Sequence, residues 1–164
     1  MKRNVALYGV LITLALMASY VESLFPVPIP VPGIKLGLAN AVTMAVLYLF
    51  GVGPTFFVSC IRIVVSGFLF GNVFAIIYSL GGGLLSLGVM CILHRMNVFS
   101  VVGVSVAGGV AHNMGQLIVA CLVVQNGNLF YYFPVLLVAG VITGLVIGLV
   151  DQEILKRISG KGNR

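Results

Sequence analysis

The stretch VAGGVAHNMGQLIVA, residues 106–120, combines the composition of a membrane-spanning helix with three hydrogen-bonding side chains. Small and aliphatic residues fill most of it, but His112, Asn113 and Gln116 lie near its middle. Ionisable and polar groups at that depth are costly in a bilayer and usually face a bundle interior or a cavity. The stretch therefore predicts a membrane fold with polar side chains gathered inside it.

The composition of the whole chain also indicates a membrane protein. Of its 164 residues, 60% are hydrophobic and only 7% are charged, and the mean hydropathy is +1.20. Soluble proteins carry about 25% charged residues. A chain of this length has room for about six spans of roughly 20 residues each. We expect one all-α domain over residues 1–164, a six-transmembrane-helix bundle with spans near 5–24, 36–53, 54–71, 73–93, 99–124 and 130–150.

Lysine and arginine residues are distributed unevenly around these spans. If the N-terminus is cytoplasmic, the outer loops hold only Lys35, and Arg62 lies within the third span. The other basic residues then lie on the cytoplasmic side: Lys2, Arg3, Arg95, Lys156, Arg157, Lys161 and Arg164. This bias predicts a multi-pass protein of the cell membrane with both termini in the cytoplasm. No basic patch typical of a nucleic-acid partner is present.

Four polar residues within the spans are candidates for ligand binding. Arg62 lies halfway along the third span, and His112 and Gln116 share one face of the fifth span by helical spacing, with Asn113 beside them. The alternative is hydrogen bonding between helices, which contributes about 0.6 kcal/mol on average in membranes. For Asn113 the two interpretations are equally good. For His112 and Gln116 together with Arg62, a ligand cavity is favoured.

Three further candidates lie nearer the outer surface. Glu22 ends the first span, Lys35 precedes the second and Asn40 lies near its start. Glu22 is the only acidic residue before position 151, so it is a partner for Arg62 or Lys35. Such a pair leaves one positive charge in excess, which suits an anionic or strongly hydrogen-bonding ligand.

Small residues recur every four positions in three spans, which allows helix backbones to approach closely in lipid. The fifth span has Gly103, Ala107, Ala111 and Gly115, and the sixth has Gly140, Gly144 and Gly148. We expect these two stripes to pack within the bundle. The pair Ala15 and Ser19 in the first span is equally suited to contact another membrane protein.

Four segments resemble the Gx transporter family, which is also labelled heptaprenyl diphosphate synthase component I. They are GIKLGLANAVTMAVLYLFG (33–51), IRIVVSGFLFGN (61–72), SLGGGLLSLGVM (79–90) and VGVSVAGGVAHNMGQLIVA (102–120). The resemblance covers roughly residues 6–158, and the His112-Asn113-x-x-Gln116 segment is its most specific part.

The family in turn resembles the substrate-binding S components of energy-coupling factor (ECF) transporters. These are six-helix membrane proteins with cytoplasmic termini that capture vitamins and cofactors at an outward-facing site. They dock on a transmembrane coupling protein and ATPases through small residues of the first helix. The resemblance implies that this chain captures a small-molecule ligand, and that Ala15 and Ser19 serve in docking, with Ser19 in place of the second alanine of the family's pattern.

Catalysis is not expected from this chain. Prenyl diphosphate synthases bind Mg²⁺-diphosphate through clustered acidic residues, whereas this chain has only Glu22, Asp151 and Glu153. The last two are expected in a solvated cytoplasmic tail. No GxxxxGK[ST] motif, metal site or cofactor site is recognisable. Two other roles remain open: a non-catalytic membrane component beside a soluble heptaprenyl diphosphate synthase subunit, and a membrane partner in flavin- or quinone-linked electron transfer.

Overall fold

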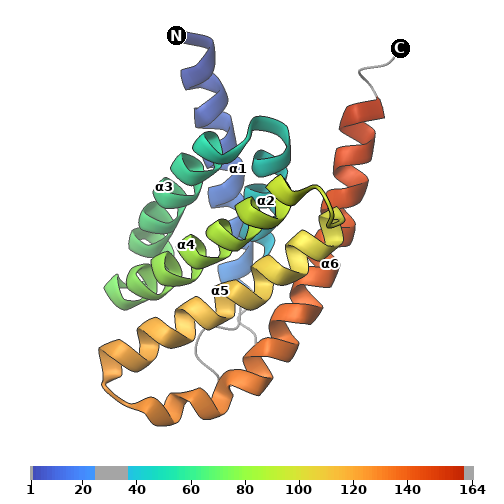
Figure 1. Cartoon of the computed structure of the whole chain (residues 1–164). Helices are drawn as coiled ribbons and strands as arrows, with labels where there is room; N and C mark the ends of the chain where they lie inside the picture. The colour runs from blue at the N-terminus through green and yellow to red at the C-terminus, as the bar shows by residue number, and fades with distance from the viewer. Residues whose placement is uncertain (1, 25–36, 161–164) are drawn as a thin grey trace.

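A computed structural model of the protein describes residues 2–24 and 37–160 (Figure 1). Over these residues all the regular structure is helical, as expected. The elements are α1 (Lys2–Leu24), α2 (Leu38–Phe50), α3 (Val52–Phe70), α4 (Val73–Met96), α5 (Val101–Val124), the short 3-10 helix η1 (Gly127–Tyr132) and α6 (Phe133–Gly160). The six α-helices form a bundle, and five of them are long and apolar enough to cross a membrane. The protein is therefore a polytopic helical membrane protein.

The second helix differs from the expected span over residues 36–53. α2 has 13 residues, so it is about 20 Å long, whereas the hydrocarbon core of a bilayer is about 30 Å thick. Glycines with positive φ set both of its ends: Gly37 at φ 80 and Gly51 at φ 83. A Cβ on Gly37 would lie 2.8 Å from Cδ1 of Ile147, near the middle of α6. α2 therefore begins inside the bundle, and the bundle has five full-length spans and one short helix.

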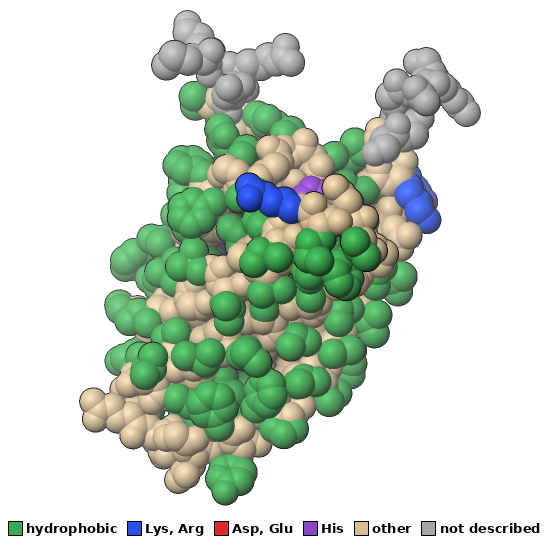
Figure 2. Space-filling view, viewed as in Figure 1, with side chains coloured by type: hydrophobic (Ala, Val, Ile, Leu, Met, Phe, Trp, Pro, Cys, Tyr) green, Lys and Arg blue, Asp and Glu red, His purple; other side chains and the backbone are tan. Residues whose placement is uncertain are grey.

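The first turn of α1 and the last turn of α6 lie at one end of the bundle, and η1 lies at the other (Figure 1). The turn between α4 and α5 lies toward the end where α1 begins and α6 ends. On the face drawn in Figure 2, lysine and arginine side chains gather near that same end, and hydrophobic side chains cover much of the remaining surface. Such an apolar exterior suits a surface in contact with lipid.

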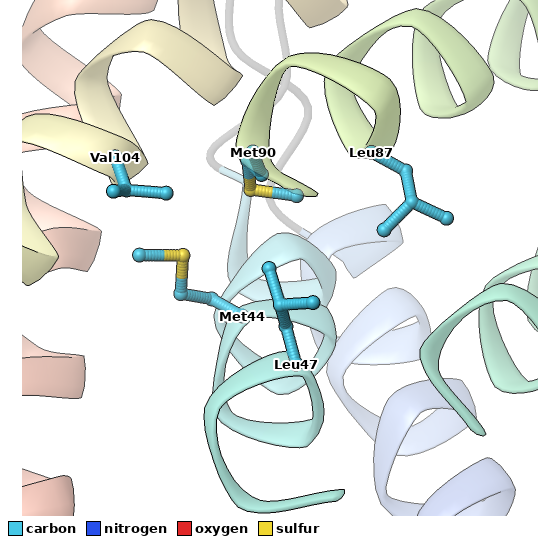
Figure 3. Close-up of a cluster of buried hydrophobic side chains, with 5 residues drawn as sticks. All are labelled: Met44, Leu47, Leu87, Met90 and Val104. Carbon is cyan, nitrogen blue, oxygen red and sulfur yellow. The ribbon is translucent and has the colours of Figure 1, made fainter. Parts of the chain in front are cut away.

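A hydrophobic cluster joins α2 to α4 and α5 (Figure 3). Its buried members are Met44 and Leu47 from α2, Leu87 and Met90 from α4, and Val104 from α5. The two methionines suit this place because an unbranched, flexible side chain fills an irregular space between helices. The cluster fixes the short helix α2 against the long helices.

Glycines bring α5 and α6 together, as the sequence predicts for the sixth span. A Cβ on Gly144 would lie 2.6 Å from Cα of Val106, and one on Gly148 would lie 2.8 Å from Cα of Val102. Gly140 is only slightly farther from α5, because its Cβ would lie 3.0 Å from the carbonyl oxygen of Gly109. No side chain larger than hydrogen fits at these three positions without moving a backbone.

The small-residue stripe predicted on the fifth span is not a single packing surface. Gly115 faces α4, since its Cβ would lie 2.6 Å from the carbonyl oxygen of Gly81. Gly109, which is not in the predicted stripe, faces α6. The atoms nearest to a Cβ on Gly103 would belong to Phe99 and Ser100, just before α5 itself. α5 is packed on both sides, so its close contacts alternate between two neighbours and do not follow one i, i+4 row.

Candidate ligand site

A polar pocket lies inside the bundle, and all six α-helices or their caps contribute to its wall. Its empty space is about 420 Å³, including the part that opens to solvent. The lining residues are Glu22, Gly37, Asn40, Arg62, Ser79, Gly109, His112, Asn113 and Thr143. Residues far apart in sequence thus meet at one place, where the short helix α2 begins.

The pocket contains five of the predicted ligand-binding residues: Glu22, Asn40, Arg62, His112 and Asn113. Gln116 is buried but is not among the lining residues. Lys35 lies outside the described residues. From the fifth span, the pocket wall thus includes His112 and Asn113 but not Gln116.

Arg62 is buried in the bundle, with 9% of its surface exposed. Its Nε atom is buried and has no hydrogen-bond partner within the part of the chain that the structure describes. The carboxylate of Glu22 is the opposite charge that interacts with this guanidinium. One oxygen of Glu22 also accepts a hydrogen bond from the backbone amide of Gly37, at the start of α2. Glu22 thus contacts a helix N-terminus and carries the charge opposite to a buried cation.

Asn113 has a structural role as well as a place in the pocket wall. Its Nδ2 donates a hydrogen bond of 2.8 Å to the carbonyl oxygen of Leu136 on α6. This bond joins α5 to α6 across the bundle. The sequence allowed two interpretations of Asn113, a place in the cavity wall or a hydrogen bond between helices. In the structure Asn113 has both.

His112 and Gln116 are held against the backbone of α4. A Cβ on Gly82 would lie 2.7 Å from the carbonyl oxygen of His112, 3.2 Å from its Cε1 and 2.6 Å from Cγ of Gln116. Both residues are buried, at 8% and 5% exposure. Gly82 therefore lets α4 pack closely against α5 at His112 and Gln116.

A second cavity adjoins the polar pocket. The two share Gly37, Asn40, Gly109 and Thr143, and the second has about 300 Å³ of empty space, including any part open to solvent. It extends toward Met44, Met90 and Ile147, which are almost fully buried. The polar pocket thus adjoins a more apolar space.

Two hydroxyl residues of the pocket wall, Ser79 and Thr143, were missed by sequence reasoning. Serine and threonine are common in membrane helices, because the hydroxyl can bond to a carbonyl of its own helix. Thr143 does so, since its Oγ1 donates to the carbonyl oxygen of Ala139 at 2.9 Å. The sequence therefore gives no signal that Thr143 lines a pocket.

The structure corrects the expectation that Asp151 lies in a solvated tail. α6 continues to Gly160, and Asp151 is 0% exposed. It lies one turn beyond Ile147 and Gly148, which face α2 and α5, so it shares their inward face. Both of its carboxylate oxygens lack a hydrogen-bond partner among the described residues. Glu153 is exposed, as expected, and forms an ion pair of 2.8 Å with Arg157.

Of the two residues predicted to serve in docking, Ala15 lies inside the bundle. Ala15 is 0% exposed, so its side chain is covered by the protein's own helices. The hydroxyl of Ser19 donates to the carbonyl oxygen of Ala15 at 3.0 Å, within α1. α1 therefore turns the face that carries Ala15 toward the bundle.

Comparison with known proteins gives a family but no individual relative. The sequence model of the family described as heptaprenyl diphosphate synthase component I matches residues 11–154. No curated protein and no solved structure matches the chain. The matched region runs from α1 into α6 and includes every described residue of the pocket wall. The chain therefore belongs to the heptaprenyl diphosphate synthase component I family.

Proposed function

We propose that the protein captures a small ligand in the polar pocket and acts as a membrane substrate-binding protein, similar to an S component of an ECF transporter. The observation that carries this proposal is the meeting of Glu22, Arg62 and His112, from three helices, around one empty space. Helix packing alone would favour filling that space, since a membrane bundle loses contacts wherever it leaves a void. A buried ionisable residue in a membrane usually marks a functional site.

In the proposed orientation, the pocket lies between the middle of the bundle and its outer end. Lys156 and Arg157 near the end of α6, and Arg95 near the end of α4, support cytoplasmic termini. Glu22 is near the end of α1 and Ser79 is in the second turn of α4, so both belong to the opposite half of the bundle. The ligand would then enter from outside the cell.

A coupling protein and ATPases remain proposed partners. The docking surface would not be centred on Ala15, because that side chain is buried. Val10, Leu14 and Met17 are exposed, at 58%, 49% and 60%, and follow one another at helical spacing along α1. We propose that a transmembrane partner would contact this outer face of α1.

Native mass spectrometry of protein purified gently from its own membrane tests the capture of a ligand. Wild type should carry a small-molecule adduct, and Arg62→Ala and His112→Ala should lose it. Arg157→Ala is the matched control for Arg62, since it removes an arginine from an exposed pair outside the pocket. An adduct that survives both pocket substitutions would refute the assignment of the site. Failure of both pocket variants to accumulate in the membrane would make the cluster structural.

The family description favours a second candidate, a non-catalytic membrane component beside a soluble heptaprenyl diphosphate synthase subunit. This role predicts that the soluble subunit co-purifies with the protein and makes prenyl diphosphate faster in its presence. Arg62→Ala should leave that stimulation intact if the pocket has no part in it. A bare wild-type mass with a stably bound synthase subunit would favour this candidate over ligand capture.

A further inference from the structure

The start of α2 is a place where an anion is stabilised. The aligned peptide dipoles of a helix give its N-terminus a partial positive charge, and its first amides point outward without partners from the helix itself. α2 has 13 residues and begins inside the bundle, and its N-cap residue is Gly37, which has no side chain to cap the first turn. The carboxylate of Glu22, from α1, accepts the hydrogen bond of the Gly37 amide there. A carboxylate thus already occupies this position.

The buried guanidinium of Arg62 is a second and independent sign of an anion site. Its Nε lacks a hydrogen-bond partner among the described residues, although the residue is more than nine-tenths buried and lines the pocket that contains Gly37. A guanidinium presents donors in a fixed geometry that fits the oxygens of a carboxylate or a phosphate. Glu22 provides the opposite charge but leaves the Nε donor unused.

We propose that Glu22 holds the place of an anionic group of the ligand. A carboxylate or phosphate group of the ligand displaces the Glu22 side chain and binds between the α2 N-terminus and Arg62. Such a group has enough oxygens to accept from both the Gly37 amide and Nε of Arg62. This inference rests on the proposed function and specifies the chemical class of its ligand: a small molecule that bears a carboxylate or a phosphate.

The inference predicts that one substitution in the pocket, Glu22→Gln, strengthens the binding of an anion. Glu22→Gln keeps the size of the side chain and an oxygen for the Gly37 amide, but it removes the competing negative charge. Hydrogen bonds to charged groups contribute about 1.5–3 kcal/mol, and about 1.4 kcal/mol corresponds to tenfold in affinity. Glu22→Gln should therefore lower the half-saturating anion concentration roughly tenfold or more.

The test measures thermal stability of the purified protein in a neutral detergent during titration with acetate and with inorganic phosphate. Sodium chloride keeps the ionic strength constant, and a bound anion raises the melting temperature by mass action. Glu153→Gln and Arg157→Gln are the matched controls, since they make the same chemical changes in an exposed pair. We expect tighter anion binding in Glu22→Gln, loss of binding in Arg62→Gln, and wild-type titrations in both controls.

Three results would overturn the inference. The first is weaker anion binding in Glu22→Gln, which would make Glu22 itself a ligand contact. The second is an equal effect of anions on Glu22→Gln and wild type, and the third is an undiminished effect in Arg62→Gln. Glu22→Gln decides the test even if the Arg62 variant fails to fold. A ligand adduct by native mass spectrometry alongside any of these results would leave the proposed function standing.

The same chemistry is present in anionic lipid headgroups, and a second arm separates the two sources. The titrations are repeated in nanodiscs of phosphatidylcholine and of phosphatidylglycerol. If phosphatidylglycerol alone stabilises wild type and removes the response to phosphate, the bound anion is a headgroup. If the response to phosphate persists in both lipids, the anion comes from a soluble ligand.

Discussion

Three glycines of α4 provide a graded test of how tightly His112 is held. A Cβ on Gly82 would meet the backbone carbonyl of His112 at 2.7 Å. A Cβ on Gly83 would meet only the end of the Ile63 side chain, at 2.7 Å, and one on Gly88 would meet nothing within 4 Å. The substitutions Gly82→Ala, Gly83→Ala and Gly88→Ala therefore add the same methyl group against backbone, against a movable side chain and into open space.

The expected stabilities follow from two opposing effects. Alanine is favoured over glycine in a helix interior by about 0.8–1.0 kcal/mol at each position. Overpacking against an immovable neighbour costs about 1–3 kcal/mol. Gly88→Ala should therefore be as stable as wild type or slightly more stable, and Gly83→Ala should be close to wild type. Gly82→Ala should be less stable than Gly88→Ala by about 1–3 kcal/mol, or roughly 2–4 °C in melting temperature for each kcal/mol.

The assay is the melting temperature of detergent-purified protein, followed as loss of the monodisperse peak in size-exclusion chromatography after heating. Ligand retention by native mass spectrometry gives a second readout. Gly82→Ala must move the backbone of His112 and should lose ligand, whereas Gly88→Ala should retain it. Equal melting temperatures for all three variants, or a loss in Gly88→Ala that matches Gly82→Ala, would refute the packing of α4 on α5 described above.

Three further substitutions test other parts of the bundle. Gly37→Ala should lower the melting temperature. The left-handed backbone at φ 80 costs a residue with a side chain about 1–2 kcal/mol, and the added Cβ would lie 2.8 Å from Ile147. An unchanged melting temperature would contradict this backbone conformation. Asn113→Leu breaks the 2.8 Å hydrogen bond to Leu136, so it should lower the free energy of unfolding by only about 0.6 kcal/mol, the average for such bonds in membranes. Chemical unfolding in mixed micelles measures this change, and a gain in stability would argue against the bond. Ala15→Leu should reduce the yield of folded protein, because the Ala15 side chain is fully buried and overpacking costs about 1–3 kcal/mol. A wild-type yield would place Ala15 on an open surface.

The existence of six helices was predictable because apolar runs dominate the sequence and few charges interrupt them. The short second helix was not. The run from Ile34 to Phe50 is apolar almost throughout, and hydropathy alone gives no reason to begin a helix at Leu38. The start depends on the positive φ of Gly37 and on its contact with Ile147, more than a hundred residues away in sequence. Neither can be read from a local pattern.

The candidate site was partly predictable because polar side chains are rare in membrane spans, so Arg62 and His112 were conspicuous. Their neighbours depended on packing that the sequence does not show. Gln116 lies one helical turn after His112 on the same face of α5, but the backbone of α4 at Gly82 packs against it. Asp151 follows the last apolar run and therefore resembled a tail residue, yet α6 continues and buries it. The rotation of a helix relative to its neighbours decides such cases.

The double packing of α5 has a consequence for the synthesis of the protein. α5 is the least hydrophobic of the five candidate spans and α6 is the most hydrophobic. The insertion machinery releases a segment into lipid according to its partition free energy, to which central polar side chains such as His112 and Asn113 contribute unfavourably. We expect α5 to depend on α6 for efficient insertion, with the glycines at 140, 144 and 148 letting the two helices associate as a hairpin. The polar side chains of the pocket are thus compatible with membrane insertion, because α5, which carries them, enters the membrane beside the strongly apolar α6.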